Sequence, residues 1–131
     1  MEEIKLPISQ IFQILEKING SEASPGLLDL DLSVSERFWM NDLNDQIRKI
    51  HGAVQNLRDD IVRRRGKPGP DGNVTLKATE KVIIEFQGEQ KESIAYTEEF
   101  LRFQREYGEL LNERYTIKVE SKILNKFFDG I

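Results

Sequence analysis

The chain has 131 residues, 38% of them hydrophobic and 32% charged, with a net charge of −4. This length suits one domain around one core, and so many charges are typical of long solvated helices. The sequence contains no cysteine, which excludes disulfides, thiolate metal sites and a cysteine nucleophile. Its acidic start lacks the bases of a signal peptide, and no apolar run approaches the roughly 18 residues of a membrane span. We therefore expect a cytoplasmic protein without membrane contact.

The charge is unevenly distributed along the chain. Residues 1–45 carry a net charge of −6, residues 46–81 carry +5, and residues 82–131 carry −3. The overall acidity argues against a general nucleic-acid binder. The basic middle still allows a local patch that binds an anion or a nucleic acid.

The first part of the chain predicts a helix followed by a strand. Apolar residues recur at helical spacing over residues 8–19, and Asn19-Gly20 ends the pattern. After a turn at Pro25-Gly26, the stretch LLDLDLSV alternates between apolar and polar residues. This alternation predicts a half-buried strand over about residues 28–34.

A long helix is predicted over about residues 36–65. We expect Ser35 to cap its start, Gly66 to end it as a left-handed cap, and Pro68 to prevent its continuation. Arginines in the last turn suit the partial negative charge of a helix C-terminus. The apolar steps of three and four define a heptad seam, formed by Met40, Leu43, Ile47, Ile50, Val54, Leu57 and Ile61.

The second half predicts a hairpin, a helix and a strand. Alternating residues over 73–77 and 82–87 indicate a hairpin over about 73–87, closed by Gly88. A second long helix is expected over about 90–112, and a strand over about 115–120. The helix would carry an aromatic-rich seam made of Tyr96, Phe100, Phe103, Tyr107 and Leu110.

These elements predict an α+β fold that is mainly α. Residues 1–131 would form a single domain with two long antiparallel helices, a short N-terminal helix and a small antiparallel β element. A heptad seam can also close against another copy of the chain, so a homodimer is possible.

The residues that could carry catalysis are sparse. His51 is the only histidine, and it stands beside the seam on a polar flank of the predicted helix. A helical di-iron site needs Glu-x-x-His, but Arg48 occupies the position three residues before His51. We therefore predict a non-enzymatic protein with no catalytic, metal or cofactor site.

Three groups of residues are candidates for binding a partner. Trp39 either anchors the start of the long helix in the core or forms an aromatic contact with a partner. The aromatic pair in the terminal segment is either a core flap or a docking tail. The arginines either complete the long helix or bind a partner by charge. The partner-binding residues of this prediction are Trp39, Arg58, Arg63, Arg64, Arg65, Phe127 and Phe128.

Four stretches resemble a family of small proteins of tailed bacteriophages. They are LLDLDL at 27–32, IRKIHGAVQNLRDDIVRRRG at 47–66, PDGNVTL at 70–76 and REYGELLNERYTIKVE at 105–120. The resemblance spans roughly residues 8–120 and implies an origin in a phage or prophage. It implies no catalytic residue.

The sequence thus predicts an interaction, assembly or host-modulating protein of a phage or mobile element. It would bind a larger phage structural or host protein through a helical face or its tail, in the host cytoplasm or in the virion. The alternative is an accessory nucleic-acid-binding protein that uses the basic residues around 58–67.

Overall fold

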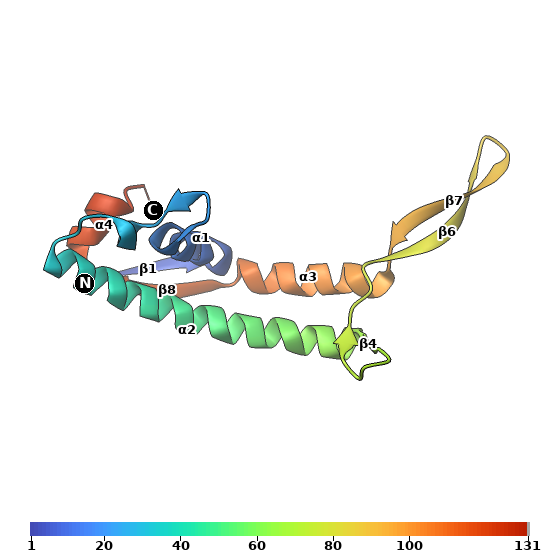
Figure 1. Cartoon of the computed structure of the whole chain (residues 1–131), viewed down its shortest axis with the longest axis horizontal. Coiled ribbons are helices and arrows are strands. Elements are labelled where there is room, and N and C mark those ends of the chain that lie inside the picture. Colours follow the sequence, from blue (N-terminus) through green and yellow to red (C-terminus); the bar gives the residue numbers. More distant parts are fainter. Residues whose placement is uncertain (131) are drawn as a thin grey trace. The chain divides into compact units, whose positions relative to one another are not determined.

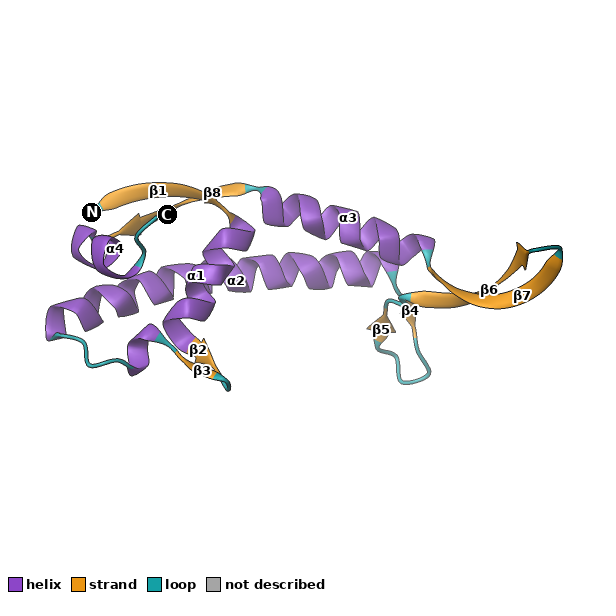
Figure 2. Ribbon diagram, turned by 90° about the horizontal axis from the view of Figure 1, so that it is seen from above, coloured by secondary structure: helices purple, strands orange, loops and turns teal. Residues whose placement is uncertain are grey.

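The computed structural model describes residues 1–130 and has an α+β fold (Figures 1 and 2). The described helices are α1 (Ile8–Asn19), α2 (Val34–Arg65), α3 (Glu98–Asn112) and α4 (Ser121–Phe127), with a 3-10 turn, η1, at Leu27–Asp29. Two long pairs of strands are antiparallel, β1 (Glu2–Pro7) with β8 (Arg114–Val119) and β6 (Thr79–Phe86) with β7 (Glu89–Tyr96). Two short antiparallel pairs join β2 (Gly20–Ser21) to β3 (Ser24–Pro25) and β4 (Lys67–Pro68) to β5 (Val74–Thr75).

The chain divides into two compact units, although the sequence analysis predicts a single domain. Unit 1 comprises Met1–Val54 and Leu110–Ile131, and unit 2 comprises Gln55–Glu109. Among the described residues, fifteen buried hydrophobic residues belong to unit 1, whereas unit 2 has only Ile61 and Phe103. Because burial of apolar surface is the main cohesive force, each unit is organised around its own, very unequal, core.

The core of unit 1 contains α1, the first part of α2, the β1–β8 pair and α4. Its completely buried side chains include Ile11, Ile47 and Ile117. Gln46 of α2 binds the backbone of β8, since its amide accepts from Lys118 N and donates to Lys118 O, both at 2.9 Å. A side chain thereby satisfies backbone groups on the edge of β8 that faces away from β1.

The predictions for α1, α2 and β8 are confirmed to within two residues at each end. The heptad seam of α2 is also buried within the chain, except at Leu57, which is 48% exposed. The buried seam residues are therefore not available to pack against a second copy, although the sequence analysis allowed a homodimer through this seam.

The predicted strand over residues 28–34 is wrong. This stretch forms η1 and an irregular segment before α2 begins at Val34. The Asp29 carboxylate accepts from Gly26 N at 2.9 Å, and the Arg37 guanidinium donates to the carbonyls of Leu28 and Leu30, both at 3.0 Å. Side chains take the place of a partner strand there, and leucine itself favours strands only moderately. The real partner of β8 is β1, which the sequence analysis did not predict.

The N-terminal cap of α2 is Ser33 rather than Ser35. The Ser33 hydroxyl accepts from Glu36 N at 3.1 Å, and Ser33 N donates to the Glu36 carboxylate at 3.0 Å. This reciprocal pair is a capping box. The other Glu36 oxygen accepts from Lys126 Nζ at 2.6 Å, which ties α4 to the start of α2 in unit 1.

The hairpin predicted over 73–87 and the helix predicted over 90–112 are both displaced. The hairpin pairs Thr79–Phe86 with Glu89–Tyr96, and α3 begins only at Glu98. The turn contains Gln87 and Gly88, whose φ angles of 54° and 79° give the twist that two-residue hairpins favour. Residues 89–93 are all polar, so β7 has no alternating pattern, and the helical spacing of Tyr96 and Phe100 indicated a helix there.

Gly66 ends α2 for a reason other than the predicted left-handed cap. Its φ is not positive, and its amide donates to Val62 O at 2.6 Å. A Cβ atom at this position would lie 2.6 Å from the carbonyl oxygen of Thr75. Glycine is therefore required because β5 passes too close to the helix end for any side chain.

We predict that stability depends on the Glu36 carboxylate at low pH. Hydrogen bonding to Lys126, and then to Ser33, lowers the pKa of Glu36 from 4.5 to about 2. A lowered folded-state pKa stabilises the fold above pH 4.5, and this contribution is lost as the pH falls from 4.5 toward 2. As the pH falls from 4.5 toward 2, the melting temperature of Glu36→Gln should therefore decrease less than that of the wild type. Glu22→Gln, in an exposed turn, is the matched control and should keep the wild-type decline.

The exposed seam position provides a control for the buried ones. Ile50→Ala should lower the free energy of unfolding by about 2–5 kcal/mol, because it leaves a cavity at a buried site. Leu57→Ala, one heptad later, should cost less than about 1 kcal/mol because Leu57 is largely exposed. If denaturant titrations showed equal losses of unfolding free energy in the two variants, the burial pattern would be contradicted.

Candidate protein interface

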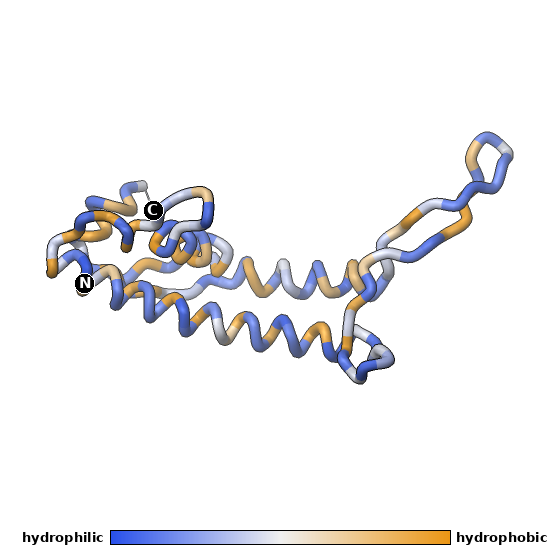
Figure 3. The backbone as a smooth tube through the Cα atoms, in the orientation of Figure 1, coloured by the Kyte–Doolittle hydropathy of each residue, from blue (hydrophilic) through white to orange (hydrophobic). Residues whose placement is uncertain are grey.

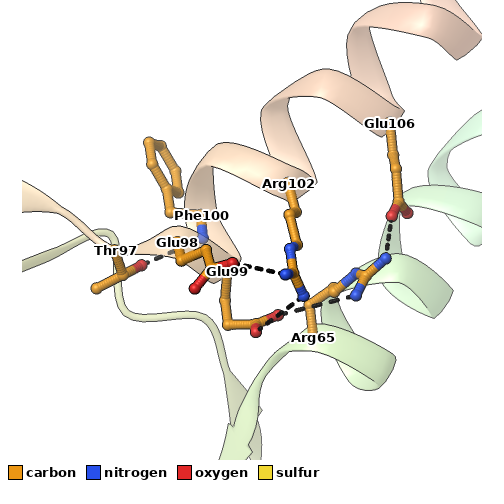
Figure 4. A network of polar contacts seen from close by, with 7 residues as sticks. All are labelled: Arg65, Thr97, Glu98, Glu99, Phe100, Arg102 and Glu106. Carbon is orange, nitrogen blue, oxygen red and sulfur yellow. Dashed lines mark hydrogen bonds and ion pairs between the residues drawn. The ribbon is translucent and has the colours of Figure 1, made fainter.

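The end of α2 and helix α3 are joined by a cluster of ion pairs within unit 2 (Figure 4). The Arg65 guanidinium pairs with the Glu106 carboxylate and lies 4.0 Å from that of Glu99. Arg102 of α3 pairs with Glu98 at 2.6 Å and approaches Glu99 at 3.7 Å. The pKa of Arg65 is raised, mainly by its hydrogen bond to Glu106. The cluster holds the last turn of α2 against α3 and pairs Arg65 with carboxylates of that helix.

An aromatic row runs from Tyr96 at the end of β7 along α3. Neighbouring ring centroids lie 5.5 Å apart for Tyr96 and Phe100, 6.3 Å for Phe100 and Phe103, and 5.7 Å for Phe103 and Tyr107. The guanidinium of Arg58 lies over the ring of Phe103, 5.6 Å from its centroid. An arginine on an aromatic face contributes favourable electrostatics in addition to packing. Phe103 is the only buried member of the row.

A groove of about 590 Å³ opens beside this row and lies entirely within unit 2. Its apolar lining comes from α2, α3 and the segment of β5, and its charged lining comes from α2 alone. The residues that line it are Arg58, Asp59, Val62, Arg63, Val74, Thr75, Leu76, Phe100 and Phe103. The groove therefore combines apolar side chains with two arginines and one aspartate.

The hairpin β6–β7 is the second unusual feature of unit 2. Large hydrophobic side chains are exposed along both strands, among them Ile83 at 72%, Ile94 at 71% and Phe86 at 53%. Figure 3 shows both hydrophobic and hydrophilic stretches in this hairpin. The sheet has only two strands, so each strand keeps one unpaired edge. Exposed apolar strands with free edges are sites at which other chains add.

The two faces of the hairpin differ in composition. The pairing places Val82, Ile84 and Phe86 on one face, together with Lys91 and Glu89 from β7. Ile83 lies on the opposite face, which also carries Ile94 and Tyr96. We refer to these as the Phe86 face and the Ile83 face.

The predicted arginines have separate roles in the structure. Arg58 covers Phe103 and approaches Asp59 at 3.7 Å, and Arg64 pairs with Asp60 at 3.3 Å. The predicted arginines therefore have different neighbours, and Arg63 is the exposed one that takes part in no described ion pair within residues 1–130.

The predicted aromatic residues lie in unit 1. Trp39 is half-buried and packs edge to face on Phe38, with centroids 4.9 Å apart. Phe128 is 2% exposed and belongs to the core, with the ammonium group of Lys17 5.3 Å from its ring centroid. Phe127 is half-buried, and its carbonyl accepts from Lys17 Nζ at 2.5 Å. Of the two alternatives for the terminal aromatic pair, Phe128 fits the core flap, because the terminal segment forms α4 and this ring is buried in unit 1.

His51 is half-buried on α2, within unit 1. His51 contacts the edge of Phe12 at 4.9 Å between centroids and lines a groove of about 410 Å³ with Arg48 and Asn19. Within residues 1–130, no three metal-binding side chains come together.

Comparison of the chain with known protein-family models, curated proteins and solved structures finds no match. No helix within residues 1–130 has the length and apolar character needed to cross a membrane.

We predict that Arg65 matters for stability and that Arg63 does not. Arg65→Gln removes a cation that holds two carboxylates of α3, so it should lower the melting temperature in circular dichroism more than Arg63→Gln does. The combined replacement of Arg63, Arg64 and Arg65 should keep the helical signal, because Gln retains helix propensity. A larger decrease in melting temperature for Arg63→Gln than for Arg65→Gln would contradict the ion-pair assignment.

Proposed function

We propose that this chain is a non-enzymatic interaction protein that binds a protein partner through the hairpin of unit 2. The main support for this proposal is the exposure of large hydrophobic side chains on both faces of β6–β7. A two-stranded hairpin is only marginally stable in water, and a monomer gains nothing by exposing isoleucine and phenylalanine there. A protein partner that covers the hairpin accounts for both features. This differs from the helical face or tail that the sequence indicated, since the seam of α2 and Phe128 are buried.

We further propose an origin in a phage or mobile element, with a role in assembly or in modulating a host protein. This part of the proposal rests on the sequence resemblance over residues 8–120.

Nucleic acid is the alternative partner, and charge makes it the weaker one. Unit 2 contains ten basic and eleven acidic residues, a net charge of −1, because α3 and the hairpin add acids to the basic stretch of the sequence. Arg58, Arg64 and Arg65 each approach a carboxylate within 4.0 Å. Neutralised arginines release few counterions from a phosphate backbone, so they contribute little to nucleic-acid affinity.

The proposal is tested by partner capture with matched variants of the full chain. Immobilised wild-type protein, Ile83→Ser/Ile94→Ser and Arg63→Gln/Lys67→Gln would be exposed to extract of the organism that encodes the chain. We expect a protein that is retained by the wild type and by the basic-residue variant but lost with the hairpin variant. With that protein purified, hydrogen exchange should slow at the amides of residues 79–96.

Two results would overturn the proposal. One is equal protein retention by the wild type and the hairpin variant. The other is a captured molecule that is lost after nuclease treatment or in moderate salt and is not retained by Arg63→Gln/Lys67→Gln. Such a molecule would indicate that nucleic acid is the partner.

A further inference from the structure

We infer that a second copy of this chain pairs with the hairpin along the free edge of β6, so that two hairpins form one four-stranded antiparallel sheet with the two β6 strands at its centre. The inference rests on the proposed function, because it names one partner of the hairpin that the proposal assigns to protein binding. It depends on the backbone edge and the charged residues of β6, whereas the proposed function depends on the exposed side chains of Ile83 and Ile94.

The free edge of β6 presents the backbone groups of its odd-numbered residues. Thr97 N donates to Ala78 O at 3.0 Å, and the pairing of β6 with β7 then continues without a bulge. Because hydrogen bonding alternates along an antiparallel strand, the even-numbered residues of β6 direct their backbone groups to β7 and the odd-numbered ones direct theirs away. Within residues 1–130, β6 has only β7 as a strand neighbour, so the backbone groups of Lys81, Ile83 and Glu85 face an open edge. Lys81 and Glu85 are also exposed and take part in none of the ion pairs described within residues 1–130.

One register of β6 against a second β6 matches both the charges and the apolar residues. A twofold axis perpendicular to the sheet aligns two copies of a strand antiparallel, and residues that stand opposite one another then share a face. With the axis at Ile83, Lys81 lies opposite Glu85 of the other copy, twice by symmetry, and Val82 lies opposite Ile84. The same register brings the outward backbone groups of Lys81, Ile83 and Glu85 into hydrogen-bonding positions. No other register of this strand with itself sets Lys81 opposite a glutamate.

The other charged residues of the hairpin are compatible with this arrangement. Glu80 would lie opposite Phe86 of the other copy, and the ammonium group of Lys91 is 5.3 Å from the centroid of that ring, so the carboxylate would meet a cation. Glu89 and Glu92 belong to β7 and hence to the two outer strands. The two copies of Glu92 would be separated by three strand spacings, about 14 Å, which exceeds the Debye length at physiological salt.

The edge of β7 has no equivalent register. The only register of β7 with itself that sets Lys91 opposite a glutamate is centred on Gln90, and it leaves Ile94 and Tyr96 beyond the end of the opposing strand. A register centred on Glu92 would oppose two carboxylates. Charges on an edge strand usually prevent pairing with another chain. On β6, a cation and a carboxylate four residues apart make the edge complementary to itself instead.

Sedimentation velocity of the whole chain in physiological salt tests this inference by charge reversal. The average mass of the wild type should rise toward that of a dimer between micromolar and millimolar concentration. Lys81→Glu and Glu85→Lys each set like charges opposite one another twice in the symmetric sheet, so each should weaken self-association about tenfold or more. Glu92→Lys is the matched control, because it makes the same change in net charge as Glu85→Lys but on the outer strand, and it should associate like the wild type.

Two combinations of these changes should restore association. The double variant Lys81→Glu/Glu85→Lys exchanges the two charges and recreates both pairs. An equimolar mixture of the two single variants sets a carboxylate of one copy opposite an ammonium group of the other in both pairs. The mixture should therefore form a heterodimer at concentrations where each single variant is a monomer. In the associated wild type, amide exchange measured by nuclear magnetic resonance should slow at Ile83, whose N–H faces the open edge.

Three results would each overturn the inference: a wild type that stays monomeric, a mixture that stays monomeric, or a Glu85→Lys chain that associates like the wild type. Circular dichroism establishes that each variant is folded, and unchanged amide exchange at Ile83 in concentrated wild-type protein would overturn the inference without any variant. The proposed function is judged separately, because all the charge variants keep Ile83 and Ile94. A different protein that is retained by these variants and lost with Ile83→Ser/Ile94→Ser would support the proposed function even if the chain itself is monomeric.

Discussion

Burial of the apolar seam of α2 is the constraint on which the rest of the structure depends. In unit 1 the seam residues Met40, Leu43 and Ile47 are almost completely buried, and α1, α4 and the β1–β8 pair complete the same core. In unit 2 the same helix continues, but Leu57 is exposed and only Ile61 is buried. The heptad spacing does not change between the two units. What changes is how much apolar surface the rest of the chain supplies to cover it.

The thin core of unit 2 explains its dependence on polar and aromatic contacts. With Ile61 and Phe103 as its buried hydrophobic residues, the unit gains little from the hydrophobic effect. Arg65 between carboxylates of α3 and Arg58 over Phe103 provide cohesion that a larger core would make unnecessary. Such contacts hold the helices side by side without filling the space between their side chains. An open groove lined by Val62 and Phe100 is the physical consequence.

The sequence could predict those elements whose pattern has a single interpretation. The long seam and the spacing of α1 specify helices, and the alternation at 115–119 specifies β8. Prediction failed where side chains replaced backbone partners, as Asp29 and Arg37 do beside η1. It also failed at residues 89–96, because this polar stretch has no alternating pattern and the helical spacing of Tyr96 and Phe100 indicated a helix. The exposure of the hairpin was not predicted, although the alternation of Val82, Ile84 and Phe86 is visible in the sequence. A charge cluster stands out in a sequence, whereas the exposure of a strand depends on the absence of tertiary neighbours.

The weak cohesion of unit 2 and the proposed docking of its hairpin are thermodynamically linked. A partner that binds only the folded unit stabilises it by mass action, in proportion to the logarithm of its concentration relative to the dissociation constant. Covering Ile83 and Ile94 would remove from water apolar surface that the isolated hairpin exposes. Partner binding and the stability of unit 2 should therefore increase together. The Ile83→Ser/Ile94→Ser variant, which removes the docking side chains, should accordingly reduce the stabilisation that the partner gives to unit 2.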